Sequence, residues 1–223
     1  MPIRYQINPE TALLYLARII ALLTAIPLHE TAHAYVSYKL GDSTAKDLGR
    51  ISLNPFKHFD LMGALFMLLV GFGWAKPVPI NLRFYNNKKI SMALSSFAGP
   101  LSNFLLAFII MILYKLMYVV YLVNSSSKLI YAVLVVFEYM IAINIILAVF
   151  NMLPIPPLDG SRIFLLILPQ KIYFGIMKYE RYIILVLFLV ISSGILNGVL
   201  NKMQIALYSL LSNATVFVDI FFR

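Results

Sequence analysis

The sequence predicts an all-α polytopic membrane protein, because its apolar runs are long and its charges are few. Of the 223 residues, 61% are hydrophobic and 12% are charged. Five stretches approach or exceed the roughly 20 residues that a helix needs to cross the hydrocarbon core of a bilayer. They are residues 11 to 28, 92 to 123, 129 to 153, 182 to 200 and 203 to 222. We therefore expect about five transmembrane helices and exclude a soluble globular fold.

The first stretch is expected to remain as a helix. It lacks a basic n-region, carries Arg18 and has no small-residue cleavage site, so it does not resemble a signal peptide. Two short segments follow it, RISL at 50 to 53 and PVPINL at 77 to 82. Their alternating pattern predicts short β-strands, and the prolines of the second segment restrict it to a sheet edge.

Residues 61 to 75 (LMGALFMLLVGFGWA) form an apolar segment that is too short for an ordinary crossing. Basic residues flank it on both sides, in segments 39 to 57 and 76 to 89. Because basic loops tend to stay in the cytoplasm, both flanks are expected on the same side of the membrane. We therefore expect a re-entrant or partly embedded segment here.

The same tendency orients the whole chain. Segments 39 to 57, 76 to 89 and 162 to 181 should be cytoplasmic, and the connections at 124 to 128 and 201 to 202 should face outward. This arrangement places the N-terminus outside. Lys and Arg outnumber Asp and Glu by 18 to 9, and basic cytoplasmic loops account for the excess without a nucleic-acid partner.

The chain is expected to form one membrane-embedded domain over residues 1 to 223, with no segment suited to a PDZ or CBS domain. The motifs lie in a core at about 11 to 162, and C-terminal helices occupy about 163 to 223. Because there is no cysteine, disulfides, thiolate ligands and a cysteine nucleophile are excluded. The lipid bilayer is an expected partner, and no oligomeric state is predicted.

The pentapeptide HETAH, residues 29 to 33, ends the first apolar stretch. On a helix His29 and His33 lie one turn apart on the same face, so both imidazoles can reach one metal ion. Glu30 stands beside them and can handle protons. Polar residues are scarce in membrane helices because each needs a partner, so the cluster predicts a metal site rather than a packing contact.

A catalytic zinc ion needs three protein ligands and one open position. The candidates for the third ligand are His58, Asp60, Glu138 and Asp159. Asp159 lies in NMLPIPPLDG, residues 151 to 160, whose prolines must break the preceding helix. Such unwinding is tolerated only inside protein or along a watery cavity. The predicted topology also places this segment on the same side as HETAH, whereas Glu138 is expected too deep.

Together the motifs resemble the site-2 protease family of intramembrane zinc metalloproteases, in its compact prokaryotic branch. The resemblance includes HETAH, GRISLNPFKHFD (49 to 60), GWAKPVPIN (73 to 81), SFAGPLSN (96 to 103) and NMLPIPPLDG. It implies one zinc ion per chain, His29, His33 and Asp159 as ligands, and Glu30 as the catalytic glutamate. Asn103 and Asn151, both from matching motifs, are candidates to donate to the transition state.

The expected function is hydrolysis of a peptide bond within or next to a transmembrane segment of a membrane protein. The expected location is a prokaryotic cell membrane, with the active site toward the cytoplasm. A metal or small-solute transporter is the alternative, because intramembrane histidines, acids and a broken helix also suit transport. A noncatalytic scaffold is a third reading, against which the intact Glu30 argues.

Overall fold

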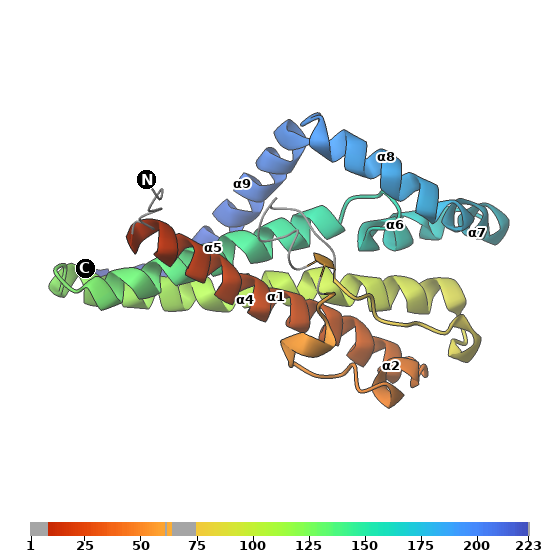
Figure 1. The fold of residues 1–223 in the computed structure, drawn as a ribbon, viewed down its shortest axis with the longest axis horizontal. Coiled ribbons are helices and arrows are strands. Elements are labelled where there is room, and N and C mark those ends of the chain that lie inside the picture. The colour runs from red at the N-terminus through yellow and green to blue at the C-terminus, as the bar shows by residue number, and fades with distance from the viewer. Residues whose placement is uncertain (1–8, 61, 64–74, 223) are drawn as a thin grey trace, which may run out of the picture.

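Three long helices form the body of the protein (Figure 1). The computed structural model describes residues 9 to 60, 62 to 63 and 75 to 222. Helices α1 (Pro9–Lys39), α4 (Lys88–Val123) and α5 (Lys128–Asn151) pack against one another. Each is long and apolar enough to cross a membrane. The described residues thus agree with the expected all-α class.

Small side chains allow these helices to pack closely. Ala17, Ala21 and Ala25 recur every four residues on α1 and are fully buried, which lets neighbouring backbones approach. Larger side chains fill the core farther along α4 and α5, where α9 (Asn197–Ala214) adds Leu211. Polar caps set where the helices begin: Asn87 accepts a hydrogen bond from Ile90 N, and Ser127 accepts one from Ile130 N.

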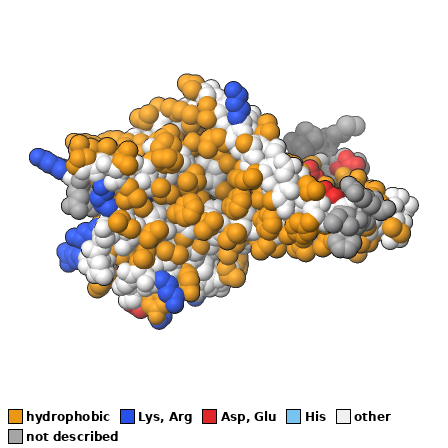
Figure 2. All heavy atoms as spheres, turned by 180° about the vertical axis from the view of Figure 1, so that it is seen from behind, with side chains coloured by type: hydrophobic (Ala, Val, Ile, Leu, Met, Phe, Trp, Pro, Cys, Tyr) orange, Lys and Arg blue, Asp and Glu red, His pale blue; other side chains and the backbone are white. Residues whose placement is uncertain are grey.

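The outer surface of the protein is apolar over a broad area. Figure 2 shows hydrophobic side chains covering most of one face, with Lys and Arg gathered toward one end. The exposed large side chains lie mainly on α1, α4, α8 (Glu180–Ser192) and α9. Such an area is too large for a protein surface in water and suits contact with lipid. The protein is accordingly an integral membrane protein.

The predicted edge strands at 50 to 53 and 77 to 82 are wrong. Within the part of the chain that the structure describes, the only β pairing is an isolated bridge between Phe59 and Ala75. The guanidinium of Arg50 joins the two segments by donating to Lys76 O at 2.5 Å and Pro77 O at 3.2 Å. Because prolines lack an N–H, a backbone ladder cannot continue through this segment.

Short helical turns lie along the described chain between α1 and α4. They are α2 (Thr44–Asp47), η1 (Pro55–Lys57) and η2 (Leu82–Phe84). The segment expected to be re-entrant, 61 to 75, lies mostly outside the described residues.

The C-terminal third departs from the predicted pair of spans. After α6 (Asp159–Phe164), η3 (Leu165–Ile167) and α7 (Gln170–Lys178), helices α8 and α9 form an arch that ends in η4 (Val216–Phe222). The predicted break at 201 to 202 falls inside α9. The chain instead turns at 193 to 196, where Gly194 has φ of 75°, a value that glycine adopts readily.

This turn changes the expected number of spans. With 13 residues, α8 rises about 20 Å, less than the roughly 30 Å of hydrocarbon. Residues Tyr182–Ser192 and Asn197–Ala214 are bent by 84°, so the described residues offer three spanning helices, or four if this pair counts as one span. The five predicted spans are not confirmed.

A buried carboxylate anchors the end of α1. Asp42 accepts hydrogen bonds from Thr44 N at 3.0 Å, Asn81 N at 2.7 Å and Ser37 Oγ at 3.3 Å. Burial alone raises the pKa of this carboxyl, but the hydrogen bonds outweigh that effect and hold the pKa below its usual value. Asp42 therefore ties the chain before α4 to the end of α1.

We expect Asp42→Ala to lower the thermal stability of the protein in detergent at pH 7. Each buried donor left unpaired costs about 1 to 3 kcal/mol. Since the folded pKa lies below the unfolded one, this stabilisation is present above about pH 4 and is lost as pH falls through the folded pKa. The gap in unfolding temperature between wild type and variant should narrow in acid. Asp47→Ala, on an exposed side chain, is the control, and an equal loss there would contradict the anchoring role.

Candidate metal centre

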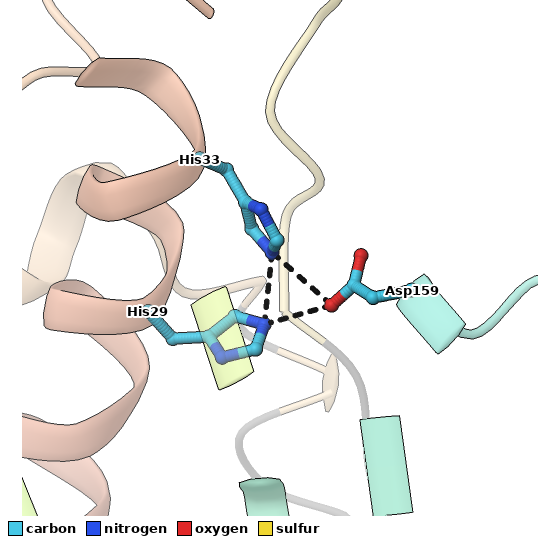
Figure 3. Close-up of side chains that lie close together, drawn as sticks. All are labelled: His29, His33 and Asp159. Atoms are coloured by element: carbon cyan, nitrogen blue, oxygen red, sulfur yellow. Dashed lines mark hydrogen bonds and ion pairs between the residues drawn. The ribbon is translucent and has the colours of Figure 1, made fainter. Parts of the chain in front are cut away.

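Two helices and one loop bring His29, His33 and Asp159 together (Figure 3). The histidines lie one turn apart on α1 and are buried, and Asp159 is the first residue of α6. The two Nε2 atoms are 3.0 Å apart. Asp159 Oδ2 lies 3.3 Å from His29 Nε2 and 3.2 Å from His33 Nε2. Within the described ranges, this is the one group of three possible metal ligands.

The hydrogen-bond partners of the Nδ1 atoms determine the tautomer of each ring, and the tautomer decides whether Nε2 carries a hydrogen or a lone pair. His29 Nδ1 lies 2.5 Å from Asn103 Oδ1, and His33 Nδ1 lies 2.7 Å from Ser95 O. Both partners are carbonyl oxygens, which only accept, so each Nδ1 must carry the hydrogen. In the neutral rings each Nε2 then presents a lone pair toward the other and toward Asp159. Such a fixed tautomer is typical of metal-binding histidines.

Three acceptors that meet in a buried place repel one another unless a cation lies between them. A tetrahedral zinc ion with bonds of about 2.0 to 2.1 Å has ligand atoms about 3.3 Å apart. The three observed separations, 3.0, 3.2 and 3.3 Å, are close to that edge length. The two imidazoles and one carboxylate therefore fit a zinc ion and leave a fourth position for water.

The loop between α5 and α6 delivers Asp159 to the histidines. Helix α5 ends at Asn151, and the prolines at 154, 156 and 157 prevent it from continuing. The loop then folds back so closely that a Cβ on Gly160 would lie 2.3 Å from Met152 O. Leu153 and Leu158 of this loop pack against Leu187 of α8, so the arch covers its apolar side.

Gly99 on α4 forms a wall of the site. A Cβ on this residue would lie 2.3 Å from His33 Nε2 and 2.6 Å from His29 Cε1. Gly99 lies in the SFAGPLSN motif, but its place against the two rings is not predicted from the sequence. The available signal was its place inside an apolar helix, where glycine costs about 1 kcal/mol relative to alanine.

Glu30 follows His29 directly and is partly buried. Its charge acts on Arg50 and His58, which belong to the loop facing this part of α1. Burial lowers the pKa of His58, and Arg50 adds to that shift while Glu30 opposes it. His58 Nε2 lies 2.5 Å from Ser52 O, so this ring is held within the loop.

The other candidates for the third ligand, His58, Asp60 and Glu138, lie outside the ligand group. Asp60 accepts a hydrogen bond from Gly63 N at 2.9 Å instead. The two predicted asparagines differ in their contacts. Asn151 donates to Leu147 O at 3.0 Å and is partly exposed, whereas Asn103 is fully buried behind His29.

Comparison with known proteins identifies the family. The sequence model of peptidase family M50 matches residues 17–193, which include every predicted site residue. The chain belongs to peptidase family M50. It is also 39% identical over 213 residues to a Bacillus subtilis (strain 168) protein named "Putative zinc metalloprotease YwhC", covering 94% of this chain and 96% of that relative. No solved structure matches the chain.

Family membership confirms the resemblance to site-2 proteases and the predicted activity, an intramembrane zinc metalloprotease. It confirms zinc as the cofactor. The alternative function, a metal or solute transporter, is not favoured. The roles of individual residues do not follow from membership alone and are argued below from the geometry.

We expect Gly99→Ala to weaken zinc binding at least about tenfold, because the added methyl group must displace one of the two imidazoles. Losses of this size are typical when the orientation of metal ligands is disturbed. Gly198→Ala is the matched control, since a Cβ at that helical position meets nothing within 4 Å. Competition with a chelator in detergent measures both affinities. Wild-type affinity in Gly99→Ala would show that this wall does not constrain the ligands.

Proposed function

We propose that His29, His33 and Asp159 hold the zinc ion of this metalloprotease and that Glu30 is its catalytic glutamate. The observation that carries the proposal is the convergence of three acceptor atoms 3.0 to 3.3 Å apart. Nothing but a cation or added protons makes that arrangement favourable, and the separations suit zinc.

When bound, zinc lowers the pKa of a coordinated water toward about 7 and polarises a carbonyl group. The chain then supplies proton transfer. Glu30 accepts the proton of the attacking water at its carboxylate and delivers it to the nitrogen of the leaving amine. Addition of the water to the carbonyl carbon and protonation of the amine together break the peptide bond without a protein nucleophile.

Charge that develops on the carbonyl oxygen of the substrate needs a donor. Asn151 suits this role because it ends α5 at the start of the loop that carries Asp159, and it is partly exposed. One such hydrogen bond contributes about 3 kcal/mol or more to the transition state. The two amide hydrogens of Asn103 are engaged with Ala25 O and Asn144 Oδ1. Its contacts therefore favour a role behind His29 over a role as donor to the substrate.

The site is proposed to open toward the cytoplasm. His29 lies twenty positions after Pro9, a rise of about 30 Å, which equals the hydrocarbon thickness. The Lys and Arg side chains gather at the end of the molecule that carries α2 and α7 (Figures 1 and 2), as cytoplasmic loops do. The bacterial relative supports residence in a prokaryotic cell membrane.

The proposed substrate is a transmembrane segment of another membrane protein. A helix keeps its peptide bonds within intact backbone hydrogen bonds, so the segment must unwind before the scissile carbonyl can be attacked. Cleavage is therefore expected within or next to the cytoplasmic end of the substrate span.

We expect Glu30→Gln to keep zinc and lose peptide-bond hydrolysis, because the general base is removed while the three ligands stay. Elemental analysis of purified protein should give about one zinc per chain. Turnover of a single-span substrate in proteoliposomes should fall by a factor of about 100 or more. Asp159→Ala is the contrasting variant and should lose both zinc and turnover. Turnover near wild type in Glu30→Gln would refute the assigned base.

Thiol labelling tests the orientation in this cysteine-free chain. Cysteines at the exposed positions Leu48 and Phe84 should react with an impermeant reagent only from the cytoplasmic side, and one at Ser126 only from outside. The basic segments predict this result. Pretreatment with a permeant reagent is the control for accessibility. Labelling of positions 48 and 84 from opposite faces would overturn the proposed orientation.

A further inference from the structure

A line of hydrogen bonds crosses three helices and ends at His29. Asn144 on α5 donates from Nδ2 to Met140 O at 2.8 Å. Its Oδ1 accepts from Asn103 Nδ2 on α4, also at 2.8 Å. Asn103 Nδ2 has a second acceptor, Ala25 O on α1, at 3.3 Å. Asn103 Oδ1 then faces His29 Nδ1.

The direction of this line is set at its start. Met140 O can only accept, so the amide nitrogen of Asn144 must point at it and the amide oxygen must point at Asn103. Asn103 therefore meets two acceptors on one side, Asn144 Oδ1 and Ala25 O. Turning its amide over would place its oxygen against both of them. The remaining oxygen must face His29, where it accepts the Nδ1 hydrogen.

Burial fixes the orientations of these two side-chain amides. Asn103 and Asn144 are both fully buried, and water has no access to replace a lost partner. In such surroundings an unpaired polar group is costly, so each amide keeps the orientation that pairs all its atoms.

We propose that Asn144 is a positioning residue of the zinc site, acting through Asn103 on the tautomer of His29. Its side chain hydrogen-bonds to Asn103 and Met140 O rather than to a member of the ligand group. With Asn144 in place, Asn103 presents an acceptor, Nδ1 of His29 carries the hydrogen, and Nε2 presents its lone pair to the metal. The proposal rests on His29 being a zinc ligand, as argued under the proposed function.

Removal of Asn144 takes away the nearer of the two acceptors that fix the Asn103 amide, and it leaves the longer contact to Ala25 O, at 3.3 Å, to oppose rotation of that amide. The rotated amide donates to His29 Nδ1, and the hydrogen of the ring then moves to Nε2. That tautomer cannot bind zinc through Nε2 until it loses the proton. His33 is held by a backbone oxygen, Ser95 O, so the same change leaves it unaffected.

The test is a double-mutant cycle read out as zinc affinity, measured by chelator competition on the full-length protein in detergent. Asn144→Leu, close in shape, should weaken binding about 10- to 100-fold, as outer-shell substitutions do. Asn103→Leu should weaken it at least as much. The double variant should be no weaker than Asn103→Leu alone, because both substitutions interrupt one line.

Two variants separate positioning from packing. Asn144→Asp should restore most of the affinity, because its buried carboxylic acid can donate to Met140 O and accept from Asn103. Ile145→Ala, a buried neighbour on α5, should lower the unfolding temperature and leave zinc affinity within about twofold of wild type. If Asn144→Leu does not fold, Asn144→Ala takes its place in the cycle.

The outcomes are distinct. Any of three results would overturn the positioning role. They are wild-type affinity in Asn144→Leu, additive losses in the cycle, and failure of Asn144→Asp to restore affinity. Unchanged affinity in His29→Ala would instead overturn the ligand assignment and with it the proposed site. If His29→Ala loses zinc affinity while Asn144→Leu keeps wild-type affinity, the proposed zinc site stands and only the positioning role of Asn144 is rejected.

Discussion

The mutual repulsion of three acceptor atoms is the constraint on which the arrangement of this protein depends. Two imidazole nitrogens and one carboxylate oxygen meet at 3.0 to 3.3 Å in a buried place. Without a cation these atoms repel one another, because burial leaves little water around them to compensate. The surrounding chain must therefore hold these three atoms in place. Helices α1 and α4 and the loop after α5 hold these atoms together.

Each of the three proposed ligands is held in a different way. His29 is fixed by a side-chain amide and His33 by a backbone carbonyl. Asp159 is placed by a helix that proline stops and by a loop that closes on Gly160. Gly99 lets α4 lie directly against both rings. Because α1 carries the histidines while these contacts come from α4 and the loop after α5, the packing of the three long helices and the geometry of the site depend on each other.

The proposed ligands could be predicted from the sequence because their signals are local. A spacing of four residues places His29 and His33 on one helix face, and the prolines before Asp159 predict that the helix is broken there. The strands at 50 to 53 failed because Arg50 replaces a backbone ladder with side-chain bonds. The last two predicted spans are not confirmed, because hydropathy does not report the turn at Gly194. The proposed role of Asn144 could not be predicted from the sequence, because it depends on a contact between residues 41 positions apart.

X-ray absorption spectroscopy at the zinc edge of the purified protein tests the central claim most directly, because it reports the atoms around the metal. The account predicts two imidazole nitrogens at about 2.0 to 2.1 Å and oxygen ligands at about 2.0 to 2.2 Å, four in all. In Asp159→Ala any zinc that remains should keep both imidazoles and lose one oxygen. A spectrum of the wild-type protein with fewer than two imidazoles, or with six oxygen ligands, would contradict a zinc ion held by His29, His33 and Asp159.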